Sequence, residues 1–368
     1  MKNLFFNKSC IKYPLTGIGQ YALNLIGELI KFPEISLSLP SKNTRENAFN
    51  LISGRNFFQE KFPFLYDVRH FYHSCKFNFK KFDIYHEPAN ILLNSDCAAV
   101  LTVHDLSWIR YPETHPAGRV RFMNKHFESG LRRADRIITP SYFVKKELID
   151  VFGVSPEIIH PIHLGGLSGF EKKEHLYTIN ILKKYNLTNH SYWLIHGALE
   201  PRKNINLVLD AFLSFPKIIR INCPLVVVGS NGWRSSKLVR RLQSLTNLGE
   251  VRYLGYINKN DLFCIISGAK ALIYPSFYEG FGLPALESIS CGTPVIASNC
   301  ASLPEVLGNA GIFIDPYDVD VLIEKMKNLL DDQEYLKKMQ RLSFERSCHF
   351  SWAECARSTL GVYELALK

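Results

Sequence analysis

The sequence predicts an α/β protein made of two doubly wound domains, each built on a parallel β-sheet. Short apolar runs alternate with helix-like segments in both halves of the chain, which is the pattern of repeated βαβ units. The chain has 368 residues, of which 46% are hydrophobic, enough for two cores of ordinary size. A strand, a glycine loop, a helix and a second strand also follow one another without interruption between residues 271 and 297.

The first predicted element is a buried strand at residues 1–6, followed by a glycine loop and an amphipathic helix. Gly17, Gly19 and Ala22 match the G-x-G-x-x-A fingerprint of dinucleotide-binding oxidoreductases. The match is weak, because the loop before Gly17 is too long for the tight turn of that fingerprint. The second strand, at residues 35–39, also lacks the ribose-binding acid after it. For these two reasons an NAD-dependent oxidoreductase is kept only as an alternative prediction.

Residues 56–82 mix aromatic and basic side chains. This composition suits the headgroup region of an anionic membrane, where rings are buried and lysines meet phosphates. Core aromatics with a solvated basic edge explain it equally well. The net charge of +10 favours an anionic partner, but no recognised nucleic-acid motif accompanies it, so we expect no nucleic acid as a partner.

The next two predicted strands end in polar residues, His86 and Glu87 on the first and His104 and Asp105 after the second. Ligands of parallel sheets lie beyond the carboxyl ends of the strands, and an imidazole there can donate or accept a hydrogen bond near neutral pH. His104 is therefore placed for a ligand contact, although a lone histidine is more often structural. His86, Glu87 and Asp105 are predicted to line an acceptor pocket.

The remainder of the first half contains a basic helix at 119–136, a strand at 137–139 and a helix capped by Ser141. The pattern then loosens between residues 164 and 190, where we expect the connection between domains. The predicted divisions are an N-terminal domain at 1–168, a C-terminal domain at 169–348 and a last amphipathic helix at 349–368.

The second half begins with a strand at 192–197, and Arg202, Lys203 and Asn204 follow it. Two adjacent cations at a strand end, just before a helix that starts at an asparagine, can bind an anion. The arginine would donate two hydrogen bonds to the anion, and the lysine would act as a point charge. Such a pair taken alone is more often a solvated loop, so its interpretation depends on the residues downstream.

The glycine loop of the second half lies between two glutamates, Glu279 and Glu287. Backbone N–H groups at the start of the following helix would face an anion, and glycines let that anion approach. Carboxylates repel phosphate, so two of them imply that hydroxyl groups are held as well. A phosphate with many hydroxyls describes a sugar nucleotide. The predicted donor-binding residues of this loop are Gly280, Phe281, Gly282 and Leu283.

Glu279 and Glu287, with seven residues between them around Gly-Phe-Gly-Leu-Pro, resemble the E-x7-E motif of retaining glycosyltransferases of family GT4. Members of that family have the GT-B fold, in which two Rossmann-like domains face each other across a cleft. The resemblance covers nearly the whole chain. It implies that Glu279 contacts the donor sugar and Glu287 the ribose. Arg202 and Lys203 would neutralise the departing diphosphate, and the last helix would cross back onto the first domain.

The same resemblance implies further donor contacts. The words Val-His-Asp-Leu around His104 are similar to those of the GT4 histidine that contacts the donor hexose. The loop with Gly17 and Gly19 is similar to one that reaches the donor phosphates. Other donor-binding positions are expected in loops at the ligand ends of two strands, namely Gly229, Tyr256 and Ile257.

No metal or cofactor is predicted. Asp318 and Asp320 match the D-x-D text of metal-using glycosyltransferases, but they lie at the start of a helix, where aspartates favour the helix dipole. The nine cysteines are scattered without a C-x-x-C pair, which favours reduced thiols and a cytoplasmic location. No run approaches the ~18 apolar residues of a membrane span.

The short sequences that flank these motifs most resemble those of bacterial mannosyltransferases of polysaccharide assembly. The resemblance implies a retaining, metal-independent hexosyltransferase that moves mannose from GDP-mannose to a lipid-linked saccharide. The product would belong to a lipopolysaccharide O-antigen or a capsule, made at the inner face of the cytoplasmic membrane. Glucose, N-acetylhexosamine and rhamnose donors stay open, and a non-catalytic sugar-binding or membrane-binding protein is a further alternative.

Overall fold

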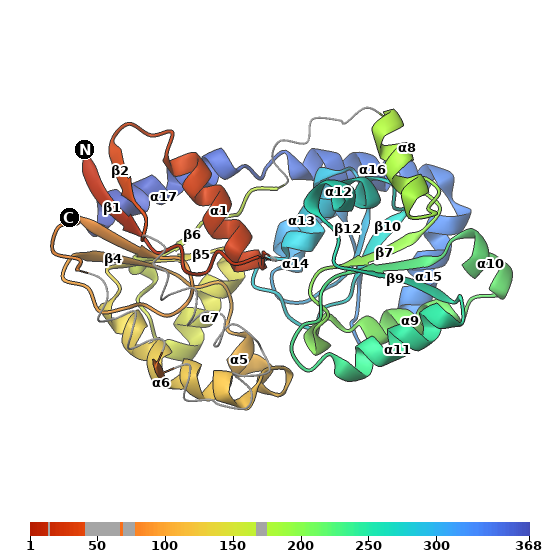
Figure 1. Ribbon diagram of the computed structural model, residues 1–368, viewed down its shortest axis with the longest axis horizontal. Helices are drawn as coiled ribbons and strands as arrows, with labels where there is room; N and C mark the ends of the chain where they lie inside the picture. The colour runs from red at the N-terminus through yellow and green to blue at the C-terminus, as the bar shows by residue number, and fades with distance from the viewer. Residues whose placement is uncertain (14, 41–66, 69–77, 167–174) are drawn as a thin grey trace. The chain divides into compact units, whose positions relative to one another are not determined.

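The computed structural model describes residues 1–13, 15–40, 67–68, 78–166 and 175–368. It divides the chain into two compact units (Figure 1). Unit 1 comprises Met1–Gly165 together with Trp352–Lys368, and unit 2 comprises Gly166–Ser351. The last helix of the chain thus belongs to the same unit as the N-terminus. Most of the aromatic and basic segment at 56–82 lies outside the described residues, as does the middle of the expected connection.

Unit 1 contains a six-stranded sheet in the order β2-β1-β3-β4-β5-β6, in which every pair is parallel. The chain runs from β1 to its neighbour β2 and then returns to the other side of β1 as β3. Its strands are β1 (Lys2–Phe6), β2 (Ile35–Ser38), β3 (Ile84–Glu87), β4 (Ala98–Thr102), β5 (Arg136–Thr139) and β6 (Ile159–Pro161).

Helices cover both faces of this sheet (Figure 1). The described helices of unit 1 are α1 (Gly17–Leu29), α5 (Ser107–Arg110), α6 (Ala117–Arg133), α7 (Tyr142–Phe152) and α17 (Trp352–Ala366), with 3-10 turns η1 (Pro112–Thr114) and η2 (Pro156–Ile158). Side chains alternate along each strand, so one face of the sheet carries the apolar core under α6 and α7. The other face carries residues that meet α1 and α17, which pack against each other.

Unit 2 contains a second six-stranded parallel sheet, in the order β12-β11-β10-β7-β8-β9. The chain runs outward from β7 through β8 to β9, then returns to the other side of β7 as β10. The loops after β7 and β10 therefore leave the sheet in opposite directions. The strands are β7 (Trp193–His196), β8 (Leu225–Val228), β9 (Val251–Gly255), β10 (Ala271–Tyr274), β11 (Val295–Ser298) and β12 (Gly311–Ile314).

The helices of unit 2 also lie on both faces of its sheet (Figure 1), and a core of buried aliphatic and aromatic side chains fills the space between. They are α8 (His175–Lys184), α9 (Ile205–Leu213), α10 (Lys217–Asn222), α11 (Ser236–Asn247), α12 (Lys259–Ser267), α13 (Leu283–Ser290), α14 (Leu303–Leu307), α15 (Val319–Asp331) and α16 (Gln333–Ser347). Two 3-10 turns join them, η3 (Pro201–Lys203) and η4 (Gly308–Ala310).

The predicted fold class, two doubly wound parallel sheets, is confirmed. The cap at Ser141 is also confirmed, because its hydroxyl accepts a hydrogen bond from the Val144 N–H. The basic helix predicted at 119–136 is shifted: α6 ends at Arg133, and Arg136 already begins β5. The observed domain divisions are 165/166 and 351/352, against the 168/169 and 348/349 expected from the sequence.

Within the described ranges, no helix combines the length and apolarity that crossing a bilayer requires. The D-x-D text has a structural function. Asp318 is the N-cap of α15, and its carboxylate accepts a hydrogen bond of 3.0 Å from the Val321 N–H. This agrees with the interpretation of the two aspartates as helix-start residues.

Candidate active site

The point where the strand order of unit 2 reverses lies between β7 and β10, which are neighbours in the sheet. In open parallel sheets the loops at such a point diverge and leave a crevice at the carboxyl ends of the strands, where ligands bind. The loop after β7 forms η3 and carries Arg202 and Lys203, while the loop after β10 carries Glu279. The fold thus brings together residues about 76 positions apart in the sequence.

Glu279 is the centre of this cluster. One carboxylate oxygen, Oε2, accepts a hydrogen bond of 3.0 Å from Arg202 Nη1. The other, Oε1, accepts from Lys203 Nζ and, at 2.8 Å, from the Tyr274 hydroxyl. Lys203 Nζ also donates to the Tyr274 oxygen and lies 4.7 Å above the centre of its ring. Three of the four residues are less than a tenth exposed, so the charges are held in fixed positions.

Burial and charge act in opposite directions on this cluster. Burial by itself would raise the pKa of Glu279, but Arg202, Lys203 and the hydrogen bonds from Lys203 and Tyr274 outweigh it and lower that pKa to about 2. Burial lowers the pKa of Lys203, and Glu279 opposes this effect. The carboxylate therefore offsets part of the effect of burial on Lys203. Tyr274 was not predicted as a site residue, because no charged residue or motif next to it in the sequence marks it.

Arg202 is held at both ends of its guanidinium group. Its Nε donates to Glu200 at 2.8 Å, and its Nη1 donates to the Tyr278 carbonyl at 2.9 Å as well as to Glu279. Glu200 was not among the predicted site residues. Two cations face two carboxylates here, so an incoming anion must compete with Glu279 and Glu200 for the cations.

Glu287 has a different environment. It lies on α13, is 8% exposed, and burial raises its pKa to about 7. His196 Nδ1 lies 3.8 Å from its Oε2, within ion-pair distance. However, burial lowers the pKa of His196 to about 4, and its Nε2 donates to the Pro284 carbonyl at 3.1 Å. The imidazole is therefore neutral at pH 7 and presents an acceptor nitrogen to Glu287, so this contact is not an ion pair.

The glycine loop forms the start of α13 as predicted, with Pro284 in the first turn and Gly292 just beyond the end. Gly282 is the N-cap residue and has a φ of 98°, a conformation that favours glycine. Phe281 is 4% exposed and contacts the Phe350 ring. Pro284 has no N–H, and the Ala285 N–H donates to the Gly282 carbonyl at 2.9 Å, so Leu283 carries the first-turn N–H from which an anion could accept.

The other predicted donor-binding residues of unit 2 lie after β8 and β9. A side chain at Gly229 would place a Cβ atom 1.9 Å from the Gly197 carbonyl oxygen, so the loops after β7 and β8 approach as closely as backbones allow. After β9, Tyr256 is 61% exposed, whereas Ile257 is 6% exposed. Of these two, Tyr256 is the accessible side chain.

In unit 1, His104 lies just beyond β4 and is 9% exposed. Its Nε2 donates to the Pro88 carbonyl at 2.8 Å, and its ring packs in a T-shaped arrangement with the Tyr21 ring, with 4.9 Å between the centroids. Burial lowers the pKa of His104, so the imidazole is neutral at pH 7. The backbone N–H of His104 donates a hydrogen bond to the side-chain oxygen of Asn90. The ring therefore has one orientation and one tautomer, with Nδ1 as the acceptor nitrogen.

His86 and Glu87 do not line an open pocket. His86 is 0% exposed, and its two ring nitrogens contact the Tyr363 hydroxyl at 2.6 Å and the Thr102 hydroxyl at 2.8 Å. Glu87 is 4% exposed and accepts from the Asn7 side chain at 2.6 Å. An acceptor could reach them only by displacing these partners. Contrary to the prediction, the structure gives both residues a function in the packing of unit 1.

Asp105 is half-buried, and its carboxylate accepts from the Ser107 N–H at 2.9 Å and the Ser107 hydroxyl at 2.7 Å. It therefore organises the turn into α5. Gly17 and Gly19 lie in the first turn of α1 and not in the loop before it, and their contact with the donor phosphates stays a prediction. The N-cap is Thr16, which accepts from the Gly19 N–H.

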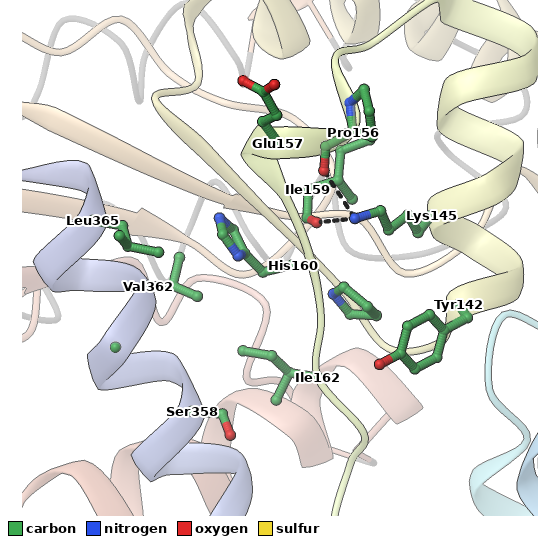
Figure 2. A pocket seen from close by; sticks show the side chains of 12 residues that line it. Tyr142, Lys145, Pro156, Glu157, Ile159, His160, Ile162, Ser358, Val362 and Leu365 are labelled. Carbon is green, nitrogen blue, oxygen red and sulfur yellow. Dashed lines mark hydrogen bonds between the residues drawn. The ribbon is translucent and has the colours of Figure 1, made fainter.

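Unit 1 also has a shallow pocket of about 690 Å³ between α7, β6 and α17 (Figure 2). Lys145 lies at its rim and donates to the Pro156 and Ile159 carbonyls, at 2.8 and 2.9 Å. The second contact satisfies one carbonyl group of the edge strand β6. None of the predicted site residues lines this pocket.

Two family descriptions match the chain. The description Glycosyltransferase Family 4 matches residues 15–165, and Glycosyl transferases group 1 matches residues 179–345. Among curated proteins, O-antigen chain mannosyltransferase B of Escherichia coli is 35% identical over 378 residues, which is 98% of this chain and 99% of the relative. O-antigen chain mannosyltransferase RfbU of Salmonella typhimurium is 28% identical, over 62% of this chain and 60% of the relative.

Solved structures agree on the fold. HepE of Anabaena, crystallised with UDP and glucose, has a TM-score of 0.71 at 17% identity, covering 98% of both chains. WaaG, a glycosyltransferase involved in lipopolysaccharide biosynthesis, has a TM-score of 0.70 at 16% identity, covering 97% of this chain and 98% of its own. Two parallel sheets, the paired glutamates and a relative 35% identical over the whole chain lead to one conclusion: the chain belongs to the GT-B glycosyltransferases of family 4.

Proposed function

We propose that this glycosyltransferase transfers mannose from GDP-mannose to a lipid-linked saccharide during O-antigen assembly, with retention of the anomeric configuration. The names of the mannosyltransferase relatives support the sugar and the product. The observation that carries the proposed chemistry is the cluster of Arg202, Lys203 and Glu279 at the switch point of unit 2. The choice of guanosine as the base comes from the resemblance to mannosyltransferases.

The cluster suits a reaction in which a diphosphate departs. Negative charge grows on the phosphate oxygen as the bond to the anomeric carbon breaks, and cations already fixed in a buried site stabilise that charge without reorganising. Arg202 and Lys203 occupy such positions, and the N–H groups at the start of α13 add a helix terminus. In this proposal the protein's own cations carry out the charge stabilisation, so the reaction uses no metal.

The two glutamates would hold hydroxyl groups. Glu279, ionised at neutral pH, would accept from hydroxyls of the hexose, and Glu287 would contact the ribose. His104 would contact the hexose through its acceptor nitrogen. For the transfer itself, the acceptor oxygen forms a bond to the anomeric carbon on the face that the leaving group occupies. The donor phosphate leaves with the bonding electrons and takes the acceptor proton.

The acceptor would be reached at the inner face of the cytoplasmic membrane. Exposed basic residues on α6 support a peripheral contact with anionic lipid, since lysine and arginine near such a surface contribute about 1 kcal/mol each. Part of this charge is already paired, because Lys125 contacts Asp67 and Arg132 contacts Glu128. The exposed lysine and arginine residues of α6 are Arg121, Lys125, Arg132 and Arg133.

A donor screen tests the proposal. GDP-mannose, UDP-glucose, UDP-N-acetylglucosamine and dTDP-rhamnose are added to the purified protein, and both thermal stabilisation and transfer to a lipid-linked mannose saccharide are measured. We expect stabilisation and transfer with GDP-mannose only, because a ligand that binds the folded state raises its stability.

Transfer should fall about 100-fold or more in Glu279→Gln and Lys203→Met. Transfer of another sugar in place of mannose would overturn the donor assignment, and full activity in both variants would overturn the site.

A further inference from the structure

We propose that the carboxyl ends of β11 and β12 form a subsite for a neutral hexose unit of the saccharide acceptor, with Tyr317 as its stacking platform. The inference rests on the proposed function, since it assigns part of the acceptor to this unit. The other members of the subsite are Phe277, Asp315 and Asn299. None of these four residues belongs to the donor-binding cluster.

The position of the subsite follows from strand register. Ser298 pairs with Ile314 at the carboxyl ends of β11 and β12, so Asn299 and Asp315 are the next residues on the two strands and lie at the same edge. Both side chains are exposed. Asp315 is close enough to Cys300 to contribute to the raised pKa of that thiol, after burial, which agrees with the register.

Tyr317 is 75% exposed, yet it is held in place. Its ring contacts the Phe277 ring at 5.1 Å between centroids, with 30° between the ring planes. Its backbone N–H donates to Asp315 Oδ1 at 2.8 Å. The Asn204 side chain donates to the Pro316 carbonyl at 2.6 Å, which ties the loop to the rest of the unit. A large aromatic ring is thus fixed by its neighbours while most of its surface stays in solvent, as in a binding surface prepared in advance.

The subsite is continuous with the donor-binding cluster. The Phe277 N–H donates to the Arg202 carbonyl at 2.9 Å, and Phe277 is two residues from Glu279 in the same loop. Asn204, which holds the Tyr317 loop, follows Lys203 directly. A saccharide on Tyr317 would therefore lie beside the loops that carry Arg202, Lys203 and Glu279.

The chemistry of the four residues fits a neutral sugar. The C–H groups on one side of a hexose ring form an apolar surface that packs on an aromatic face, while carboxylate and amide groups bind the hydroxyls at its rim. Asp315, Asp318 and Asp320 give this edge negative charge, which disfavours phosphate groups and anionic lipid headgroups. The occupant is therefore an uncharged unit of the glycan and not its lipid pyrophosphate.

The test compares Tyr317→Ala, Tyr317→Phe and the control Phe344→Ala, which removes a 56% exposed aromatic ring from α16. Transfer from GDP-mannose is measured to methyl α-mannoside and to an α-linked mannotetraose. We expect a roughly tenfold higher KM for the tetrasaccharide in Tyr317→Ala, which corresponds to about 1.4 kcal/mol of stacking. The kcat, the KM for GDP-mannose and the Tyr317→Phe values should stay within about twofold of the unsubstituted protein.

Binding is measured separately by saturation-transfer NMR with the tetrasaccharide alone. If the unsubstituted protein binds it and Tyr317→Ala does not, the subsite stands even where no mannose is transferred, and only the proposed function fails. If Tyr317→Ala and Phe344→Ala bind and transfer equally well, the subsite is overturned while the proposed function stands. A rise in the GDP-mannose KM equal to that for the tetrasaccharide would also overturn it, because the effect would then lie in the donor site.

Discussion

Two glutamates of one motif have opposite electrostatic environments, although both are less than a tenth exposed. Glu279 faces two cations and the Tyr274 hydroxyl, and its pKa falls to about 2 in spite of burial. Glu287 lies 3.8 Å from the neutral His196, and burial raises its pKa to about 7. Burial raises the pKa of both carboxyl groups, and the cations beside Glu279 reverse that effect at Glu279 alone.

Replacing Tyr274 by phenylalanine should shift the pH dependence of transfer. The ring would stay over Lys203, but Glu279 would lose a hydrogen-bond donor and its pKa would rise, so the acid limb of kcat/KM against pH should move to higher pH. We expect about a tenfold loss of kcat. The control is Tyr192→Phe, which loses a buried hydroxyl bonded to the Ile265 carbonyl. Identical pH profiles in the two variants would contradict a positioning function for Tyr274.

Replacing Glu287 by glutamine should stabilise the protein at alkaline pH. The folded pKa of about 7 lies above the ordinary value of 4.5, so Glu287 binds its proton more tightly when folded. Its contribution to stability is complete below pH 4.5 and is lost as the pH rises through 7. About 1.4 kcal/mol per pKa unit gives a loss of up to about 3 kcal/mol.

Urea unfolding at pH 4.5, 6 and 8 measures this effect. The Glu287→Gln variant should match the unsubstituted protein at the lowest pH and exceed it increasingly toward pH 8, while its affinity for GDP-mannose falls. The exposed Glu345→Gln serves as a control without such a trend. A variant less stable than the unsubstituted protein at pH 8 would show that Glu287 is not destabilised by burial.

At the scale of single elements, the carboxyl edge of unit 2 depends on close approach between loops. Gly229 follows β8 and Gly197 follows β7, and there is no space for a side chain between them. The Gly229 N–H donates to the Gly255 carbonyl at 2.8 Å, which continues the contact to the end of β9. The loops after three neighbouring strands are therefore positioned by backbone contacts.

Gly229→Ala should destabilise the protein and weaken donor binding. The new methyl group would lie 1.9 Å from the Gly197 oxygen, and overpacking of this kind typically costs about 1–3 kcal/mol. Gly27→Ala is the matched control, because its methyl group would meet nothing within 4 Å and the site lies in α1. That variant should gain about 0.5–1 kcal/mol. Equal unfolding midpoints in urea for the two variants would rule out the close approach.

At the scale of the whole molecule, the last helix completes the first unit. Helix α17 packs on α1, β4 and β5, and its Tyr363 hydroxyl reaches the buried His86 between the helix and the sheet. His86 in turn contacts Thr102, which contacts the Tyr21 hydroxyl at 3.0 Å. Residues from both ends of the chain thus share one buried polar network, which must be fully hydrogen-bonded to be stable.

Tyr363→Phe should lower the unfolding temperature. The substitution keeps the ring and leaves one nitrogen of a buried imidazole without its partner, which costs about 1–3 kcal/mol. For a unit of this size that is a shift of about 2–4 °C for each kcal/mol, measured by calorimetry. Tyr256→Phe, at a 61% exposed tyrosine, should leave the temperature unchanged. No shift in Tyr363→Phe would mean that the network does not hold α17.

Much of the fold could be predicted from local sequence. Apolar runs of about four residues, Ser141 at a cap, and Pro284 and Gly292 at the two ends of α13 are signals whose physical cause lies within a few residues. The paired glutamates and the Arg202 and Lys203 pair were found in the same way. Tyr274, Glu200 and His196 were missed, because each acts on a residue that is distant in sequence or lies at a strand end without a motif.

The sequence by itself determined the alternation of strands and helices, the two domains and the motif of this glycosyltransferase family, since each depends on neighbours along the chain. Only the tertiary structure decided the electrostatic state of the side chains. It buried His86 and Glu87, although the sequence places them at the end of a strand, where ligands bind. It also lowered the pKa of Glu279 to about 2 and raised that of Glu287 to about 7. The burial of a side chain and the charges around it depend on which strands become neighbours in the sheet. Local sequence patterns do not determine that order.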